Sequence, residues 1–128
     1  MLQKIENYHH AVAQLEQAVA VYSKDQSDSL YRDGLIQRFE FTVELAWKSL
    51  KEYLEDQGSV ITMASPRAVL KDAYTAGIIM DAETWDAIIR SRNVTSHVYD
   101  EQTAIDVAVQ ICRDYLPVLK KLDNFYQE

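Results

Sequence analysis

The residues of this chain best suited to chemistry lie between positions 90 and 100, in the segment Arg-Ser-Arg-Asn-Val-Thr-Ser-His-Val-Tyr-Asp. Arg92 supplies a fixed positive charge, His97 a group that titrates near neutral pH, and Tyr99 a phenolic hydroxyl. No carboxylate interrupts the segment before Asp100, although the whole chain has a net charge of −7. This set of groups suits work on a phosphate or a nucleotide. The alternative is a polar helix end whose side chains cap backbone groups and solvate a turn.

The spacing within this segment constrains how a helix can present it. In an ideal helix Arg92 and Tyr99 are nearly eclipsed, whereas His97 lies about 140° away from Arg92 around the axis. Asp100 is suited to be the N-cap of a following helix, which requires a break close by. We therefore expect the helix to break before His97, so that His97 and Tyr99 lie at an exposed junction between two helices.

Length and composition restrict the class of protein. The 128 residues are 48% hydrophobic and 26% charged, which predicts one globular domain spanning residues 1–128. The net charge of −7 argues against broad electrostatic binding to nucleic acid, so any contact with RNA or a nucleotide needs a local basic pocket. The sequence shows neither a signal peptide nor a long uncharged apolar run, from which we expect a cytoplasmic protein without a membrane partner.

Few residues are placed to bind a metal. The single cysteine, Cys112, excludes an internal disulfide framework and a cysteine-based zinc site, and its apolar neighbours indicate a buried, inert thiol. His9 and His10 diverge by about 100° on a helix, so they do not easily chelate one ion. Glu40 and Glu44 share a helix face, as paired acids do in bundle metal sites, but no matching histidine or acid stands elsewhere. We expect neither a metal nor a cofactor.

Helical periodicity dominates the chain that must position these residues. Apolar stripes predict long helices over about 2–22 and 30–56, a third that starts at Asp81, and a fourth that starts at Asp100. A short helix should begin at Pro66. With short connections and no strand pattern, the predicted fold class is all-α: an antiparallel up-down bundle of four long helices plus one short helix.

Turn and cap residues divide these helices. The run 27–29 (Ser-Asp-Ser) offers N-cap candidates for the second helix, and Gly58 is a plausible C′ residue just past its end. Ser65 and Pro66 indicate an N-cap followed by the first helical residue, and Gly77 should end that short helix.

Three further expectations concern packing. Phe39 and Trp47 are predicted core anchors. The connector 57–64 contains apolar residues at 60, 61 and 63, so it should pack onto the bundle. Pro117 falls inside the last apolar stripe, where it should kink the helix or leave a carbonyl unpaired.

The motif Arg92-x4-His97-x-Tyr99 resembles the signature of HEPN-domain proteins, specifically those encoded beside a minimal nucleotidyltransferase. A second block, residues 34–48 (GLIQRFEFTVELAWK), resembles the second-helix block of the nucleotidyltransferase substrate-binding protein family. Further blocks follow that family's order, namely Ser65-Pro66, Ala76-Gly77-Ile78-Ile79, Trp85 and the stretch from Arg92 to Asp100. The resemblance therefore spans nearly the whole chain.

The resemblance implies an all-α bundle that forms a homodimer or higher homo-oligomer and pairs with a separately encoded minimal nucleotidyltransferase. In related HEPN proteins the arginine and histidine form a metal-independent RNase site near the dimer interface, and the motif tyrosine can accept AMP. Carried over here, Arg92 and His97 would be catalytic and Tyr99 would be the nucleotidylation acceptor. The neighbours implied to orient or bind are Asn93, Ser96 and Asp100.

Three functions from different classes remain open on this basis. The first is a toxin-like endoribonuclease regulated by nucleotidylation from its partner. The second is a non-catalytic subunit that binds substrate for the nucleotidyltransferase. The third is a structural interaction module.

Overall fold

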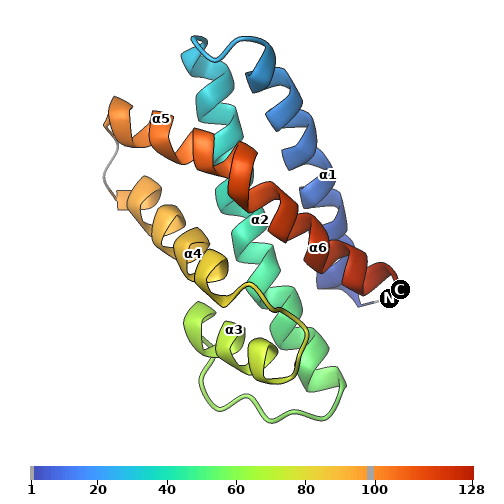
Figure 1. The fold of residues 1–128 in the computed structure, drawn as a ribbon. Coiled ribbons are helices and arrows are strands. Elements are labelled where there is room, and N and C mark those ends of the chain that lie inside the picture. The colour runs from blue at the N-terminus through green and yellow to red at the C-terminus, as the bar shows by residue number, and fades with distance from the viewer. Residues whose placement is uncertain (1, 98–99) are drawn as a thin grey trace.

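A computed structural model describes residues 2–97 and 100–128, without the side chain of His97. The helices are α1 (Gln3–Lys24), α2 (Ser29–Asp56), α3 (Pro66–Thr75), α4 (Ala82–His97), α5 (Glu101–Gln110) and α6 (Leu116–Gln127). A π-helical turn, η1 (Ile111–Tyr115), joins α5 to α6 into one continuous helix (Figure 1). The described residues contain no strand. The predicted all-α bundle of four long helices and one short helix is confirmed.

Helix α2 is the central element of the bundle. Helix α1 lies antiparallel along it, and α3, α4 and α5 also pack against it (Figure 1). Its core-facing residues Leu35, Phe39, Val43 and Leu50 are at most 1% exposed. The prediction for Phe39 is therefore confirmed, whereas Trp47 is only partly buried and packs at the margin of the core.

The helix starts follow the predicted capping residues. Asp28 caps α2 by accepting hydrogen bonds from the backbone N–H groups of Leu30 and Tyr31, at 2.9 and 3.0 Å. Ser65 caps α3, where Pro66 is the first helical residue. Each cap satisfies backbone donors that have no partner inside the helix.

Two glycines end helices as predicted. Gly58, with φ of 96°, follows α2, and Gly77, with φ of 77°, follows α3. After α2 the Ser59 N–H donates to the Leu54 carbonyl at 2.9 Å and the Gly58 N–H donates to Glu55 at 3.0 Å. This pair of bonds is a Schellman motif, whose left-handed residue favours glycine because a Cβ atom is strained there.

The end of α4 differs from the sequence-based expectation. The predicted break before His97 is wrong, because α4 continues through His97. The hydroxyls of Thr95 and Ser96 lie 3.1 and 2.9 Å from the Arg92 carbonyl, within the last turn of the helix. Asp100 does cap the start of α5, as predicted, so the junction between the two helices follows His97. Tyr99, which we expected at that junction, lies outside the described residues.

The connector 57–64 packs less closely than expected. Val60 and Met63 are 85% and 65% exposed, so the expectation is wrong for these two side chains. Only Ile61 of the three packs against the core. Apolar content alone does not bury a segment that lacks the periodicity of a helix or strand.

Pro117 is accommodated by the π-helical turn that precedes it. The Leu116 N–H donates to the carbonyl of Ile111, five residues earlier, instead of four. A proline ring ordinarily collides with the carbonyl four residues back, and the wider turn changes that spacing. The same turn places Tyr115 against α2 and α4. Its ring stacks on that of Phe39 in α2, with the ring centroids 5.6 Å apart, and its hydroxyl oxygen lies 2.7 Å from Ser91 Oγ in α4.

Two of the residues considered for metal binding, Cys112 and His9, have structural roles instead. Cys112 is half-buried, and burial raises the pKa of its thiol, which keeps the thiol neutral and unreactive. His9 Nδ1 lies 2.9 Å from a carboxylate oxygen of the buried Asp123, which joins α1 to α6. No helix in the described part of the chain has the length and apolar character needed to cross a bilayer.

The buried Arg32 leads to a prediction about stability. This residue is 6% exposed, and its Nε atom has no hydrogen-bond partner among the described residues. An unpaired buried donor destabilises a fold by about 1–3 kcal/mol. We expect Arg32→Met to raise the free energy of unfolding in urea by an amount of that order, because methionine keeps the apolar stem without the unpaired donor.

Arg38 on the same helix provides the matched control. Its guanidinium donates to the Gln14 carbonyl at 2.8 Å and so ties α2 to α1. Arg38→Met should lower the free energy of unfolding. Equal effects of the two substitutions would contradict the assignment of Arg32 Nε as an unsatisfied buried donor.

Candidate functional site

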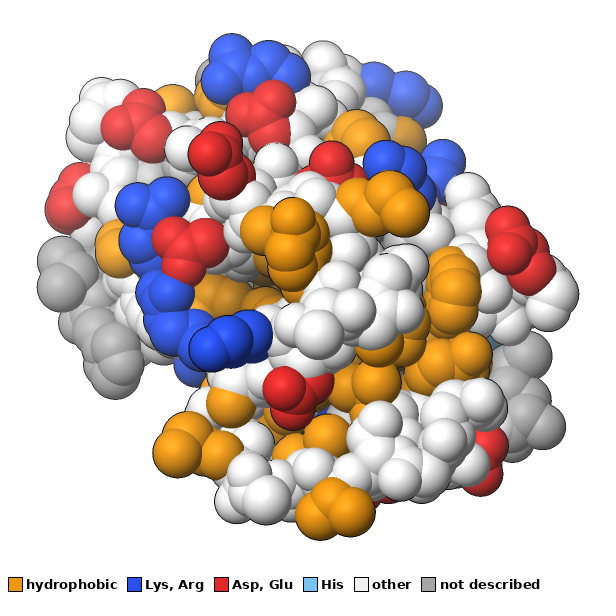
Figure 2. All heavy atoms as spheres, turned by 60° about the horizontal axis from the view of Figure 1, so that its bottom comes forward, with side chains coloured by type: hydrophobic (Ala, Val, Ile, Leu, Met, Phe, Trp, Pro, Cys, Tyr) orange, Lys and Arg blue, Asp and Glu red, His pale blue; other side chains and the backbone are white. Residues whose placement is uncertain are grey.

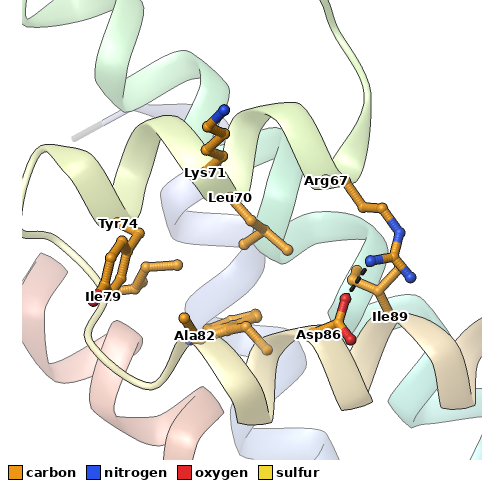
Figure 3. A pocket seen from close by; sticks show the side chains of 9 residues that line it. Arg67, Leu70, Lys71, Tyr74, Ile79, Ala82, Asp86 and Ile89 are labelled. Carbon is orange, nitrogen blue, oxygen red and sulfur yellow. Dashed lines mark hydrogen bonds and ion pairs between the residues drawn. The ribbon is translucent and has the colours of Figure 1, made fainter.

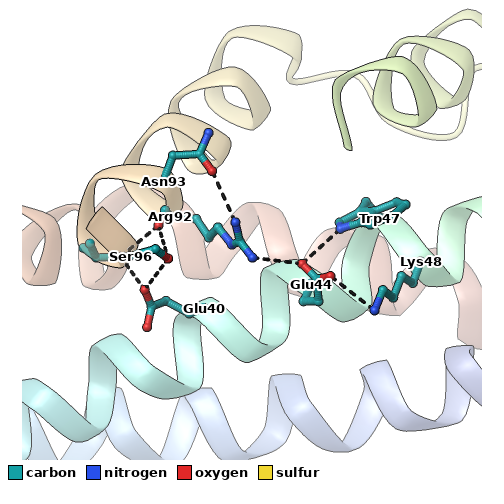
Figure 4. A network of polar contacts seen from close by, with 8 residues as sticks. Glu40, Glu44, Trp47, Lys48, Arg92, Asn93 and Ser96 are labelled. Atoms are coloured by element: carbon teal, nitrogen blue, oxygen red, sulfur yellow. Dashed lines mark hydrogen bonds and ion pairs between the residues drawn. The ribbon is translucent and has the colours of Figure 1, made fainter. Parts of the chain in front are cut away.

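A polar contact between α2 and α4 forms the candidate site. Glu40 and Glu44 are four residues apart on one face of α2 and point toward α4 (Figure 4). Glu44 Oε2 lies 3.2 Å from Arg92 Nη2, and Glu40 Oε2 lies 3.0 Å from Ser96 Oγ. Since Glu44 faces Arg92 and the earlier Glu40 faces the later Ser96, the two helices run antiparallel at this contact.

Glu44 accepts hydrogen bonds from three side chains. Besides Arg92, Trp47 Nε1 donates to Oε2 at 3.2 Å and Lys48 Nζ lies 3.2 Å from Oε1. Partial burial alone would raise the pKa of the Glu44 carboxyl. The hydrogen bonds from Trp47 and Lys48 and the positive charges of Lys48 and Arg92 outweigh that effect, so the pKa lies below its ordinary value. Glu44 is therefore a fixed negative charge at neutral pH.

Arg92 is oriented by Glu44 but not fully occupied by it. Its Nη1 also lies 3.3 Å from the side-chain oxygen of Asn93, and the Arg92 side chain is 34% exposed. The other guanidinium N–H donors have no acceptor among the described residues. A planar guanidinium held by one edge can still bind an anion, a phosphate in particular, through its remaining donors.

Glu40 holds the last turn of α4. Its Oε2 accepts from Thr95 Oγ1 at 2.8 Å as well as from Ser96 Oγ. Each hydroxyl has one hydrogen, which is shared between Glu40 and the Arg92 carbonyl. These contacts fix the backbone of the helix end that His97 closes.

The structure brings together some of the predicted site residues and not others. Arg92 and Ser96 lie in the network on α2, and Asn93 is beside them on the exposed side of α4. His97 is the last residue of the same helix. In a continuous helix, position 97 lies about 140° around the axis from position 92, so the two residues are on different faces of α4.

Asp100 has a structural role at this end of the molecule. Its carboxylate accepts from the backbone N–H of Thr103 at 2.9 Å and from the Thr103 hydroxyl at 2.8 Å. These bonds lower the pKa of the Asp100 carboxyl. Asp100 is thus the N-cap of α5, and its predicted role in orienting or binding remains a prediction.

Sequence reasoning missed the α2 side of the site. Glu40 and Glu44 were considered together as metal ligands, and Trp47 was expected in the core, but none of the three was assigned to the Arg92 site. Their four-residue spacing matches that of Arg92 and Ser96 on the facing helix, but spacing alone does not show that the two helices face each other. In the described part of the chain, no three His, Cys, Asp or Glu side chains are grouped as a metal ion requires.

The family of this chain follows from its match to a protein-family model. The model described as nucleotidyltransferase substrate binding protein like matches residues 3–128. The chain belongs to this family. A relative from Haemophilus influenzae, described as a probable ribonuclease HepT, is 35% identical over 108 residues, covering 76% of this chain and 74% of the relative.

A solved structure of a related protein has the same fold as this chain. A Haemophilus influenzae protein described as having the fold of a substrate binding domain of a nucleotidyltransferase matches with a TM-score of 0.83 and 32% identity. The match covers 97% of this chain and 99% of that protein. The similarity therefore extends over nearly the whole chain, including the contact network between α2 and α4.

A more distant match extends the fold relationship. A Shewanella oneidensis HEPN toxin, solved in a tri-AMPylated form with the antitoxin MNT, has a TM-score of 0.78 and 16% identity. The match covers 99% of this chain and 98% of the toxin. At this identity the likeness shows a common HEPN-like fold.

The Glu44 network leads to a pH-dependent prediction. Because the pKa of Glu44 is lowered in the folded state, its contribution to stability is complete above the ordinary value of 4.5 and is lost as the pH falls through the lower folded value. Glu44→Gln should therefore lower the free energy of unfolding at pH 7 by about 1 kcal/mol, which is below the usual range for charged hydrogen bonds because the site is partly exposed.

The check is thermal unfolding of wild type and Glu44→Gln from pH 7 to pH 3. The difference in Tm should stay constant down to about pH 5 and shrink below that. Glu16→Gln, which breaks an exposed ion pair with Lys120, is the control and should change Tm little. A difference that grows as the pH falls would contradict the assigned role.

Proposed function

We propose that this chain is a metal-independent endoribonuclease, the HEPN-like subunit of a cytoplasmic two-component system. In this proposal its partner is a separately encoded minimal nucleotidyltransferase, which regulates it by transferring AMP to Tyr99. Family membership and the HEPN-like fold support the class of protein. Arg92 and His97 are the proposed catalytic residues.

The observation that carries the proposal is the state of Arg92. Its guanidinium is held by Glu44 at 3.2 Å, yet the side chain is 34% exposed and keeps donors available for an anion. Such a group stabilises negative charge that develops on a phosphate during cleavage. His97, at the end of the same helix, would take the proton from a ribose 2′-hydroxyl or give one to the leaving oxygen.

Self-association is part of the proposal. A continuous α4 directs Arg92 and His97 about 140° apart around its axis, so one helix does not present both to a single phosphate in the simplest way. A twofold axis beside this helix would let each chain complete the site of the other, as a symmetric dimer does. The geometry of α4 thus supports a homodimer as the active form.

A non-catalytic role is the second candidate. The solved Haemophilus influenzae protein at 32% identity is described as a substrate binding domain of a nucleotidyltransferase. Under this alternative the free donors of Arg92 would hold a phosphate of the substrate while the partner carries out the chemistry. RNA cleavage by the purified chain separates the two candidates.

The first functional prediction concerns cleavage of RNA by the purified chain. Cleavage should persist in EDTA, and His97→Ala should reduce its rate by about 10²–10⁴-fold, as expected for loss of a general acid or base. Arg92→Ala should cost about 10²–10³-fold, as for loss of one group that stabilises the transition state. The measurement is single-turnover cleavage of a labelled RNA, with circular dichroism to verify folding.

Two substitutions at exposed positions of like residue type serve as controls. His10→Ala on α1 and Arg113→Ala in η1 remove the same kinds of side chain away from the network and should leave the rate unchanged. Full activity of His97→Ala, or activity that disappears with EDTA, would rule out the mechanism. No cleavage by the wild-type chain would favour the substrate-binding candidate.

The second functional prediction concerns Tyr99. With the nucleotidyltransferase and ATP present, we expect an AMP adduct on Tyr99 and loss of RNA cleavage, because the added phosphate would pair with the available donors of Arg92. Peptide mass spectrometry of wild type, Tyr99→Phe and the exposed-tyrosine control Tyr31→Phe locates the adduct. Labelling that persists in Tyr99→Phe, or an adduct that leaves cleavage intact, would refute this regulation.

A further inference from the structure

A hollow lies between α3 and α4. Its volume is about 220 Å³, and its walls are mostly apolar (Figure 3). The apolar side chains that line it are Leu70, Tyr74, Ile79, Ala82, Trp85 and Ile89. Most of these belong to the core, but Ala82 and Tyr74 are exposed, so the hollow opens to solvent.

The size of the hollow indicates which kind of molecule or side chain can fill it. Pockets for drug-sized ligands typically measure about 300–1,000 Å³, which is larger than this hollow. A space of about 220 Å³ lined by aliphatic and aromatic groups instead fits one large apolar side chain from another protein. Buried anchors of this kind supply most of the binding energy at many interfaces.

The charges at the edge of the hollow are mainly positive. Arg67 and Lys71 from α3 and Asp86 from α4 line it, and Asp86 forms ion pairs with both Arg67 and Arg90. Two cations and one carboxylate therefore line the hollow, in a chain whose net charge is −7. Figure 2 shows Lys and Arg side chains beside a depression with a hydrophobic floor on this face of the molecule. The edge is complementary to carboxylates that flank an apolar anchor.

The apolar surface continues beyond the hollow. Tyr74 is 52% exposed, and Met80, next to the lining residue Ile79, is 74% exposed. Flexible methionine and an exposed tyrosine are side chains that recur at protein-binding surfaces. These side chains enlarge the contact to one that a polypeptide segment can cover.

The hollow is separate from the Arg92 network. Asp86 turns toward α3, where it pairs with Arg67, whereas Arg92 turns toward Glu44 on α2. Helix α4 therefore carries two polar faces with different partners. An occupant of the hollow would leave the free donors of Arg92 uncovered.

We propose that the hollow between α3 and α4 is a docking site for a protein partner that inserts one large apolar side chain flanked by carboxylates. The apolar floor takes the side chain, and Arg67 and Lys71 attract the flanking acids. The docking site does not depend on whether the chain cleaves RNA.

The test uses synthetic peptides and the two tryptophans as reporters. The probes are acetylated seven-residue peptides with one central Leu, Met, Phe or Trp and glutamates on both sides, titrated into the isotope-labelled full chain. The indole N–H signal of Trp85 should shift saturably in the NMR spectrum, because Trp85 lines the hollow. The indole N–H signal of Trp47 should not shift, because Trp47 does not line the hollow and its indole donates to Glu44 at the contact between α2 and α4.

Matched peptides and variants sharpen the test. Peptides with lysine in place of glutamate should bind at least about tenfold more weakly, a difference of about 1.4 kcal/mol. Ala82→Trp should block the hollow without disturbing the core, because Ala82 is exposed. Lys71→Glu should weaken binding of the acidic peptides, and Ala13→Trp on the exposed side of α1 should not.

Several results would overturn the proposal. These are no shift of the Trp85 signal with any acidic peptide, equal binding of acidic and basic peptides, or unchanged binding by Ala82→Trp. A Trp85 shift that appears on raising the concentration of the chain alone would identify a second copy as the occupant and would equally refute an acidic partner.

Discussion

The carboxylate of Glu44 connects the center of the bundle to the helix that carries the candidate site. Helix α2 packs against α1, α3, α4 and α5, and Glu44 projects from it toward α4, where its carboxylate oxygen lies 3.2 Å from Arg92 Nη2. Glu40, one turn earlier, fixes the end of the same helix through Thr95 and Ser96. The position of Arg92 therefore depends on the rigidity of α2. A change in the packing of α1 on α2 would be transmitted to the site without touching it.

The limits of the helices were predictable where one residue type satisfies a local requirement. Asp28, Ser65 and Asp100 offer a side-chain acceptor to unpaired backbone donors, and Gly58 and Gly77 adopt the left-handed conformation that other residues avoid. These requirements act within a few residues. They can be recognised in a sequence without any knowledge of the tertiary fold.

The errors arose where distant contacts decide the outcome. The break expected before His97 followed from local spacing, but Glu40, 57 residues earlier in the chain, holds the last turn of α4 together through Ser96. Trp47 was expected in the core and instead lies at its margin, where it donates to the Glu44 oxygen that also binds Arg92 of the distant α4. Arg92 and Ser96, which lie in the contact network, were singled out from the sequence. The acids that orient Arg92 could not be assigned to it until the antiparallel register of α2 and α4 was known.

The π-helical turn η1 has a consequence for the two ends of the last helix. One residue more than an α-helical turn rotates everything after it by about 100° relative to an unbroken α-helix. Before the turn, the helix presents Ala104 and Ala108 to the core near α2 and α4; after it, Leu119 accepts a hydrogen bond from the Tyr8 hydroxyl of α1 at 2.7 Å. A single helix thereby serves two neighbours whose directions differ. Removal of one residue from η1 would restore regular geometry and turn Leu119 and Asp123 away from α1, so this inserted residue sets which faces of the bundle can close together.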